Sequence, residues 1–441
     1  MTTVDRGIGV IGGGPAGLAA AWSLSSSGRF VRVYEARRRP GGRLRTELVA
    51  GAGADAAVQL LSDGYDRFLR MVSDLGLRDR LVAVPGRDAI WRRGRTHTLR
   101  YGSMTSLAAS GAIPAALKLR LGMRYVPFLE RNAEHLDLND PSRAASAGLD
   151  GESIAEWGAR EVGTEFVEYL AYPLLAAYYG VTPEETSAGL FHALAHAGMR
   201  VTVVGARGGA GSLMAEVSSA LSGRGVELRT EWPVAELEPV EGGVRVRSER
   251  GEVVHDAVVV ATPVREAARL VPGLEWLGSV RVRPTATLVV SLDSPLRTGW
   301  FGLSVPRVEE PGAVLSAVCV QEEKGTGVVG DGRGALVAMP APPRAEWWAS
   351  AAPGDVLSEA LPALATLLPG IRSRIVEARL VRLPGGAFIP EPGHFDRLRR
   401  RETDLLPPRV ALAGDYLVAP TVEGAVRSGL NAAEAVSRAG W

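Results

Sequence analysis

Residue types that build metal and disulfide sites are scarce in this 441-residue sequence. It contains one cysteine, Cys319, which excludes a disulfide framework and a cysteine-based metal site and favours a reducing compartment. No apolar run approaches the ~18 residues that a membrane-spanning helix requires. The formal net charge of +1 gives no electrostatic reason to expect a nucleic-acid partner. We therefore expect a cytoplasmic protein that binds a small-molecule substrate and no nucleic acid.

The histidines include one pair with a spacing that metal sites use. His192 and His196 are four residues apart, so one face of a helix carries both. A third ligand and the glutamate of H-E-x-x-H are missing, however. We therefore expect packed or pocket-lining histidines and no metal.

The residues from Gly7 to Glu35 carry the pattern of a dinucleotide-binding unit. A short apolar strand precedes Gly12-Gly13-Gly14-Pro15-Ala16-Gly17, which matches G-x-G-x-x-G, and strong helix formers follow. The first glycine of such a motif permits a tight turn, the second lets the backbone approach a pyrophosphate, and the third lets the helix pack on the strand. A second strand ends at Glu35, whose carboxylate can accept both ribose hydroxyls of an adenosine. An acid there argues against the 2′-phosphate of NADP.

Two further stretches connect this unit to a known family. Glu35 is followed by Gly41-Gly42-Arg43, and the strand from Arg409 ends in Gly414-Asp415 before Pro420 to Gly429 opens a final helix. These stretches resemble the FAD-binding motifs of the flavin amine oxidase superfamily, which includes amine oxidases, protoporphyrinogen oxidases and phytoene-desaturase-like enzymes. The resemblance implies FAD as the cofactor. We expect it to be bound non-covalently, because Cys319 lies within a predicted strand and not near the final helix.

The resemblance also implies which residues bind FAD. They belong to the glycine turn, the end of the second strand, a segment that reaches the flavin ring, two strand ends and the final helix. They are Gly12, Gly14, Pro15, Ala16, Gly17, Glu35, Ala36, Gly42, Arg43, Val58, Gln59, Val234, Ala261, Thr262, Gly414, Asp415, Thr421, Val422, Glu423 and Ala425. In the family, the aspartate at the position of Asp415 binds the ribityl–phosphate arm, and the helix after it points its N–H groups at N1 and C2=O of the flavin.

The implied fold class is α/β, with a Rossmann-like FAD-binding domain and an inserted α+β substrate domain of helices on a mixed sheet. We expect the FAD domain to comprise residues 1–78, 200–272 and 395–441, and the substrate domain to comprise residues 79–199 and 273–394. Residues 132–151 read as a loop, and residues 153–198 as helices interrupted at Pro173 and Pro183. Val226–Leu228 reads as the first strand of an antiparallel meander, and 286–292, 314–318 and 335–339 as strands before a helix over 355–368.

The aromatic helical layer over residues 153–198 favours a bulky substrate. We expect the substrate pocket to include Tyr172, Tyr178, His192 and Tyr416. Two departures weigh against a simple amine substrate. Many amine oxidases have a lysine that holds a water at the flavin N5, but residues 285–292 contain none. Thr421 stands where those enzymes often place an aromatic cage residue.

We expect an FAD-dependent oxidase or desaturase that removes hydride from a C–H or C–N bond of a bulky, largely apolar molecule. No second G-x-G-x-x-G motif is present, which argues for O2 or another acceptor, and not NAD(P)H, as the partner that reoxidises the flavin. The alternatives are an amine or amino-acid oxidase, a protoporphyrinogen-type oxidase, a flavin-dependent isomerase without net redox change, and a protein that uses FAD only structurally. No general base is evident, and the oligomeric state is left open.

Residues 103–129 form a basic amphipathic pattern with two interpretations. Lys118, Arg120 and Arg124 lie among apolar residues, as in helices that rest on an anionic membrane. We favour a core-facing helix with arginine stems lying along apolar surface, and peripheral membrane contact is the alternative.

Overall fold

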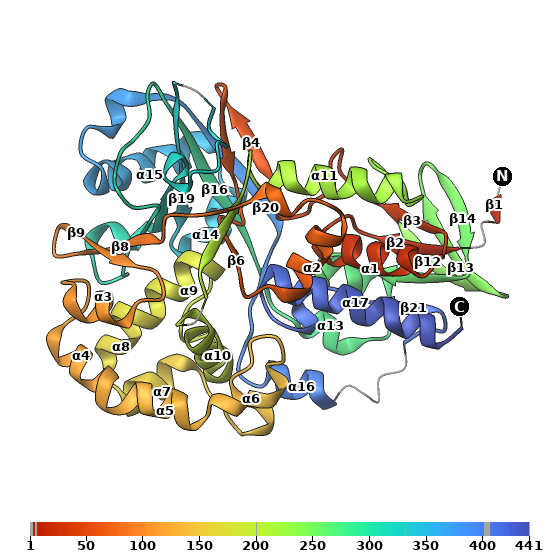
Figure 1. Cartoon of the computed structure of the whole chain (residues 1–441), viewed down its shortest axis with the longest axis horizontal. Coiled ribbons are helices and arrows are strands. Elements are labelled where there is room, and N and C mark those ends of the chain that lie inside the picture. Colours follow the sequence, from red (N-terminus) through yellow and green to blue (C-terminus); the bar gives the residue numbers. More distant parts are fainter. Residues whose placement is uncertain (1–2, 5–6, 200, 331, 401–405, 441) are drawn as a thin grey trace.

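The computed structural model describes residues 3–4, 7–199, 201–330, 332–400 and 406–440. Figure 1 shows two regions side by side. One contains α1, α11 and α17 around a parallel sheet, and the other contains a large mixed sheet above a layer of helices. The long strand β20 and the β4–β5 hairpin lie where the two regions meet. No helix in the described part of the chain has the length and apolar content to cross a bilayer.

The first region is built on a five-stranded parallel sheet assembled from distant segments. Its order is β11-β3-β2-β15-β21, and every pairing is parallel. The strands are Glu227–Arg229, Val31–Tyr34, Ile8–Ile11, Ala257–Val260 and Val410–Leu412. The three central strands are fully buried and consist almost wholly of apolar residues, as strands covered on both faces do.

One expectation about this sheet is wrong. Val226–Leu228 does not begin the meander, because β11 pairs in parallel with β3 and the antiparallel meander contains only the next three strands. These are β12 (Glu236–Val240), β13 (Gly243–Ser248) and β14 (Gly251–His255). The helix α11 (Ala210–Gly223) precedes β11, so the chain returns along the sheet in the parallel direction that a helical crossover imposes.

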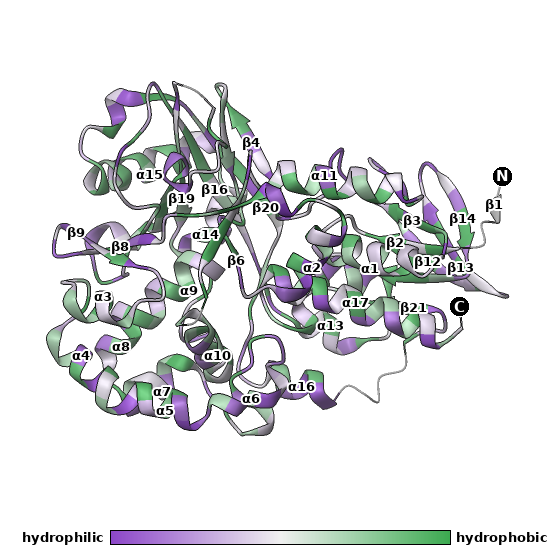
Figure 2. Cartoon of the chain, viewed as in Figure 1, coloured by the Kyte–Doolittle hydropathy of each residue, from purple (hydrophilic) through white to green (hydrophobic). Residues whose placement is uncertain are grey.

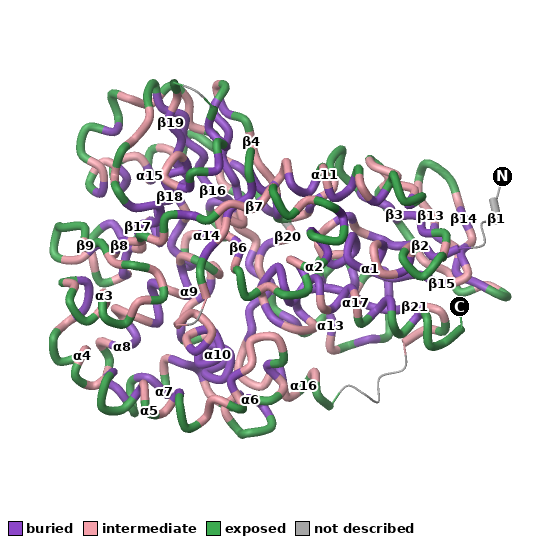
Figure 3. The backbone as a smooth tube through the Cα atoms, viewed as in Figure 1, coloured by how far each residue is buried: buried purple, intermediate pink, exposed green. Residues whose placement is uncertain are grey.

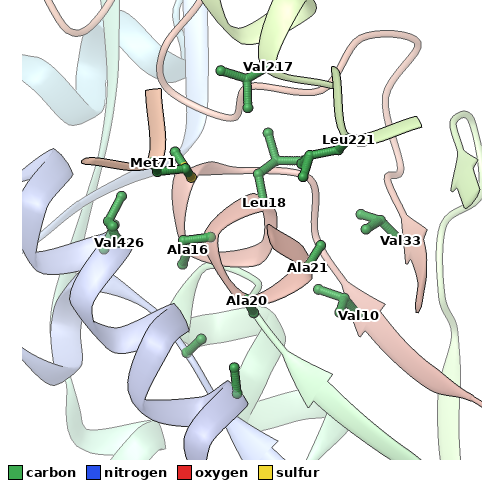
Figure 4. Close-up of a cluster of buried hydrophobic side chains, with 14 of the residues drawn as sticks. Val10, Ala16, Leu18, Ala20, Ala21, Val33, Met71, Val217, Leu221 and Val426 are labelled. Atoms are coloured by element: carbon green, nitrogen blue, oxygen red, sulfur yellow. The ribbon is translucent and has the colours of Figure 1, made fainter. Parts of the chain in front are cut away.

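Helix α1 (Pro15–Ser26) is the centre of the core on one face of the parallel sheet. Figure 4 shows Leu18 facing Val217 and Leu221 of α11, with Val426 of α17 (Val422–Arg438) on the other side of α1. Helix α2 (Asp66–Asp74) contributes Met71 to the same cluster. Helices α1 and α17 can approach closely because Gly429 has no Cβ. A Cβ there would lie 2.0 Å from the Ala16 carbonyl oxygen.

The second region contains a seven-stranded sheet in the order β20-β16-β19-β18-β17-β8-β9. The strands are Ile375–Phe388, Val282–Leu292, Gly334–Pro340, Leu315–Val320, Gly302–Ser304, Arg87–Arg92 and Arg95–Arg100. Helices α14 (Pro342–Ser350) and α15 (Pro353–Leu367) pack on it. Figure 2 shows apolar central strands beside amphipathic helices. The hairpin of β4 (Thr46–Val49) and β5 (Ala52–Asp55) buries Val49, Ala52 and Ala54 against the same sheet. The strands and the helix predicted here are present, while β17, β20 and α14 were not predicted.

A layer of helices lies beside strands β8 and β9. Its members are α3 (Met104–Ala109), α4 (Ala115–Arg120), α5 (Val126–Arg131), α6 (Ser142–Ser146), α7 (Ile154–Glu161), α8 (Thr164–Phe166), α9 (Tyr172–Tyr179) and α10 (Ala188–Gly198). Figure 3 shows α10 buried and the outer turns of α4 and α5 exposed. Residues 132–151 are not wholly a loop, since they include α6.

Contrary to the expectation above, the helix is not interrupted at Pro173. A π-helical turn at Val167–Ala171 precedes it, and α9 continues directly from that turn. Proline has no N–H to bond and obstructs the carbonyl four residues before it, and the wider π turn accommodates both effects. Pro183, in contrast, lies in the gap between α9 and α10.

The division into two domains at the bounds given above stays a prediction. One contact crosses the predicted boundary between the domains: α16 (His394–Arg400) packs against α6 in the helical layer. The Asp396 N–H donates to the Asp150 carboxylate at 2.9 Å, and the Gly393 N–H donates to the Asp150 carbonyl at 2.7 Å. Residues 393–400 are therefore held by the helical layer.

Candidate active site

The glycine turn between β2 and α1 contains two glycines that the chain's own packing requires. Gly12 has a φ of +108°, and a Cβ there would meet the Ala261 carbonyl oxygen at 2.6 Å. A Cβ on Gly17 would lie 1.9 Å from the Gly12 carbonyl oxygen. Gly14 is different, because the nearest atom to its Cβ would be the Gly42 Cα at 3.9 Å. The turn therefore leaves open space at Gly14, at the N-terminus of α1.

Glu35 is fixed beside this turn by two backbone donors. Its carboxylate accepts a hydrogen bond from the Gly13 N–H at 2.9 Å and another from the Arg37 N–H at 2.8 Å. On the opposite side, Thr262 follows β15, and its hydroxyl is buried without a hydrogen-bond partner among the described residues. A buried hydroxyl without a partner is costly, and a ligand bound at this turn could satisfy it.

A cavity of about 1410 Å³, part of it open to solvent, extends from the turn to the mixed sheet. We call it the cofactor cavity. Eight of the predicted FAD residues line it: Pro15, Arg43, Val58, Gln59, Asp415, Thr421, Val422 and Ala425. Arg43 and Asp415 form an ion pair of 2.6 Å at its edge. The α17 N-terminus opens into it, and the Thr421 hydroxyl caps that helix by accepting the Gly424 N–H at 2.9 Å.

These residues fit FAD, as three observations show. Gly14 leaves the backbone open at the N-terminus of α1, where unpaired N–H groups favour a diphosphate. The Glu35 carboxylate is placed for the ribose hydroxyls. The N-terminus of α17 faces the cavity with the positive end of its dipole. The residues at these three places were all predicted from the sequence.

The other twelve predicted FAD residues do not line the cofactor cavity. Eight of them belong to the glycine turn or lie next to it, and the remaining four are Ala36, Val234, Gly414 and Glu423. Ala36 is exposed just beyond Glu35, and the Val234 carbonyl accepts from the Arg269 guanidinium at 3.0 Å. Gly414 donates its N–H to the Ser428 hydroxyl at 2.9 Å, and a Cβ on it would meet the Tyr416 ring at 2.2 Å. Ala36, Val234 and Gly414 stay predictions as FAD contacts. The fourth residue is Glu423.

Glu423 faces away from the cofactor cavity. It is fully buried, and its two carboxylate oxygens accept hydrogen bonds from the N–H groups of Arg67 and Phe68, at 3.1 and 3.0 Å. Arg427 donates to the same carboxylate at 2.8 Å. Glu423 therefore caps the N-terminus of α2 and joins it to α17, where an acid interacts favourably with the helix dipole.

A Glu423→Gln variant tests this assignment. We expect it to lower the free energy of unfolding by about 1–3 kcal/mol, because an amide cannot accept both N–H groups. The FAD dissociation constant should change by less than about tenfold. Urea unfolding and fluorescence titration with FAD measure the two quantities, with Glu434→Gln on the exposed side of α17 as the control. A large loss of FAD affinity at unchanged stability would instead make Glu423 a cofactor ligand.

A second cavity, of about 1190 Å³, adjoins the first. We call it the apolar cavity, because most of its wall is apolar side chains from α3, α5, α9 and α10. Tyr178 and Tyr179 line both cavities and so mark the wall or passage between them. The polar groups at its edge include Asp88 on β8 and Ser304 at the end of β17.

Of the predicted substrate-pocket residues, only Tyr178 lines either cavity. Tyr172 is buried beneath the Arg307 guanidinium, and Tyr416 is buried with its hydroxyl 3.4 Å from the Ala413 carbonyl. His192 is fully buried among aromatic rings, and its Nδ1 lies 3.2 Å from the Tyr125 hydroxyl. Burial lowers the pKa of His192 to about 3, so it is neutral at physiological pH.

The two histidines of α10 are held by different partners. His196 has its Nδ1 3.3 Å from the Leu136 carbonyl and packs with the helical layer. No group of three potential metal-ligating side chains occurs in the described part of the chain. Both histidines are therefore packing residues of α10.

Several cavity residues were not predicted. Thr285 and Thr287 of β16 line the cofactor cavity in the region where the lysine of amine oxidases was sought. Asp88 is a charged residue in β8, and Ala89 and Trp91 of the same strand are buried. An acid within such a strand is a signal that could have been noticed, although its partner, Tyr178, lies 90 residues later in the sequence.

Comparison with known proteins supports the same assignment. The model of the family described as flavin containing amine oxidoreductase matches residues 15–437. The chain is 29% identical to a putative flavin-containing monoamine oxidase, AofH, of Mycobacterium tuberculosis, over 59% of this chain and 57% of that protein. It thus spans little more than half the length of that relative. It is 28% identical to hydroxysqualene dehydroxylase of Rhodopseudomonas palustris, over 99% of this chain and 100% of that protein.

A solved structure has the same fold. The putative protoporphyrinogen oxidase from Exiguobacterium sp. 255-15 superposes with a TM-score of 0.76 at 19% identity, covering 99% of this chain and 100% of that one. This likeness concerns the fold alone and agrees with the α/β class and the Rossmann-like domain predicted above. Because the family model covers nearly the whole chain, the protein belongs to the flavin containing amine oxidoreductase family, and its cofactor is FAD.

Proposed function

We propose that this protein is an FAD-dependent oxidase or desaturase whose substrate is a bulky, largely apolar small molecule. The observation that carries the proposal is the pair of adjoining cavities that share Tyr178 and Tyr179. One cavity fits FAD and the other offers a large apolar volume beside it. When bound, FAD supplies the acceptor for a hydride from a substrate carbon.

The chain's own residues bind the substrate, orient it and exclude water from it. The apolar wall provided by residues such as Leu121, Leu129 and Leu194 favours an apolar substrate and removes it from water. The N-terminus of α17 faces the cofactor cavity and stabilises negative charge that develops there. Cys319 lies outside both cavities, and burial raises its pKa to about 12, so it is a thiol and not a nucleophilic thiolate. This supports non-covalent FAD.

The test is the absorbance of the purified protein, followed by anaerobic mixing with a porphyrinogen, a polyene and cyclohexylamine. We expect a yellow protein that is bleached by one of the first two compounds and regains its colour in air. Cyclohexylamine as the best substrate would replace the proposal with an amine oxidase, which the tyrosine-lined passage also permits. Turnover without lasting bleaching would point to an isomerase, and a protein that cannot bind FAD would refute the proposal.

Peripheral membrane contact through residues 103–129 stays a prediction. The apolar side chains of Leu107, Leu121 and Val126 face the apolar cavity, which supports the core-facing interpretation of these helices. Leu119 and Met123 are exposed on the outer side.

A further inference from the structure

We propose that Asp88 is the proton acceptor of the reaction and that Tyr178 positions it; this inference rests on the proposed function. Asp88 lines the apolar cavity, and its carboxylate accepts a hydrogen bond from the Tyr178 hydroxyl. Tyr178 in turn lines the cofactor cavity as well. The pair therefore connects the volume proposed for the substrate with the volume that fits FAD.

The proposed reaction releases a proton that such a group can accept. When a substrate H–C–X–H is oxidised, the C–H bond breaks and both of its electrons leave with the hydride to FAD. The X–H bond then breaks, its electrons form the C=X bond, and a proton is released. A carboxylate at the cavity wall receives that proton and later passes it to water. Without an acceptor in the apolar cavity, the positive charge left by hydride removal would have no outlet.

The surroundings of Asp88 suit it to this role. Burial raises its pKa to about 6, and the hydrogen bonds from Tyr178 and from the Gly302 backbone act in the opposite direction. An acid with such a pKa is mostly ionised at pH 7 and close enough to it to exchange protons. Burial also raises the pKa of Tyr178 well above that of an ordinary tyrosine, and Asp88 adds to the effect. The Tyr178 hydroxyl is therefore a donor to the carboxylate.

The other titratable groups near Asp88 are weakly acidic or belong to the cavity wall. Tyr101 stands beyond β9, its ring centroid 6.2 Å from that of Tyr178, and burial with a contribution from Asp88 raises its pKa to about 12. Cys319 on β18 also interacts with Asp88, and Arg100 lines the same cavity. Among the described residues, Asp88 forms no ion pair, so no cation of the chain neutralises its carboxylate.

Two variants test the assignment. Since Asp88 must be ionised to accept a proton, kcat/KM of the wild-type protein should rise with pH through about 6. Asp88→Asn should lower kcat by about 10²- to 10⁴-fold and abolish that rise. Tyr178→Phe removes a donor to the ionised form, so it should move the rise to higher pH and reduce kcat less. Asp79→Asn, on the exposed surface, and Tyr172→Phe, on the same helix but outside both cavities, are the matched controls.

A second readout does not depend on turnover. The infrared band of protonated carboxyl groups, recorded on the FAD-loaded protein against pH, should contain a component with a midpoint near 6. That component should be absent from Asp88→Asn and shifted to higher pH in Tyr178→Phe. Its absence from the wild-type protein would overturn the proposal even if no substrate is found.

The two proposals fail in different ways. If no compound bleaches the wild-type flavin, the proposed function fails while the infrared titration still tests Asp88. If a compound bleaches the wild type and Asp88→Asn at the same rate, the oxidase function stands and Asp88 is not the proton acceptor.

Discussion

Replacing Gly14 with valine is expected to give a folded protein that has lost FAD. The backbone at Gly14 has a φ of −80°, which any residue adopts, and a Cβ there would meet no atom of the chain closer than 3.9 Å. The added side chain would therefore occupy the space left for the diphosphate and not disturb the fold. We expect the FAD dissociation constant to rise by about 100-fold or more, which corresponds to about 2.7 kcal/mol.

Fluorescence titration of the apoprotein with FAD measures this loss, and circular dichroism and urea unfolding check the fold. Gly354→Val is the matched control, because Gly354 lies in the exposed first turn of α15 with no atom within 4 Å of its Cβ position. Gly17→Ala offers a contrast, since its Cβ would lie 1.9 Å from a backbone oxygen and should destabilise the protein itself. A Gly14→Val protein that stays yellow after dialysis would show that the diphosphate binds elsewhere.

Lys324→Met is expected to cost about 3–5 kcal/mol of unfolding free energy. Lys324 is fully buried, and its ammonium group pairs with Asp55, which is 2% exposed. The other Asp55 oxygen accepts from the Thr46 hydroxyl at 2.7 Å and from the Ala210 N–H at 2.8 Å. Methionine fills a similar volume but leaves the Asp55 carboxylate as a buried charge without its cation.

Urea unfolding of the apoprotein and of the FAD-loaded protein gives this free energy. Arg438→Met breaks a highly exposed ion pair with Glu434 and should cost under about 1 kcal/mol, so it controls for the loss of a positive charge. The double variant Lys324→Met with Asp55→Asn should be less destabilised than the sum of the two single variants, because neither charge is then left uncompensated. A cost for Lys324→Met no larger than that of Arg438→Met would mean that Asp55 is protonated or hydrated.

The glycine turn and the elements on either side of it could be predicted because their signal is local. Gly12, Gly14 and Gly17 follow a strand and open a helix, and backbone geometry alone restricts what that order can do. Glu423 is harder to assign from the sequence, for the opposite reason, and its role as an FAD contact stays a prediction. Its position next to the α17 N-terminus was predicted correctly, but its orientation depends on α2, which begins over 350 residues earlier in the sequence.

Contacts between residues that are distant in the sequence explain the other differences between prediction and structure. Glu227–Arg229 alternates like a meander strand, and only the helix before it and its pairing with Val31–Tyr34 make it parallel. Strand β20 contains a Pro-Gly-Gly stretch, which weakens the strand pattern in the sequence, yet it pairs along most of β16. The Asp88–Tyr178 pair was missed because it exists only once α9 packs beside β8.

The order of strands in the parallel sheet has a consequence for how the protein folds. Strand β15 pairs with β2, at residues 8–11, and with β21, at residues 410–412, so the contacts of this sheet join segments near the two ends of the described chain. Such a high contact order predicts slow folding. During synthesis, the first glycine turn emerges long before α17 can pack on α1, and FAD has no complete site until that late step. FAD therefore binds after α17 has packed on α1, and newly made protein should pass through a folded stage that holds no cofactor.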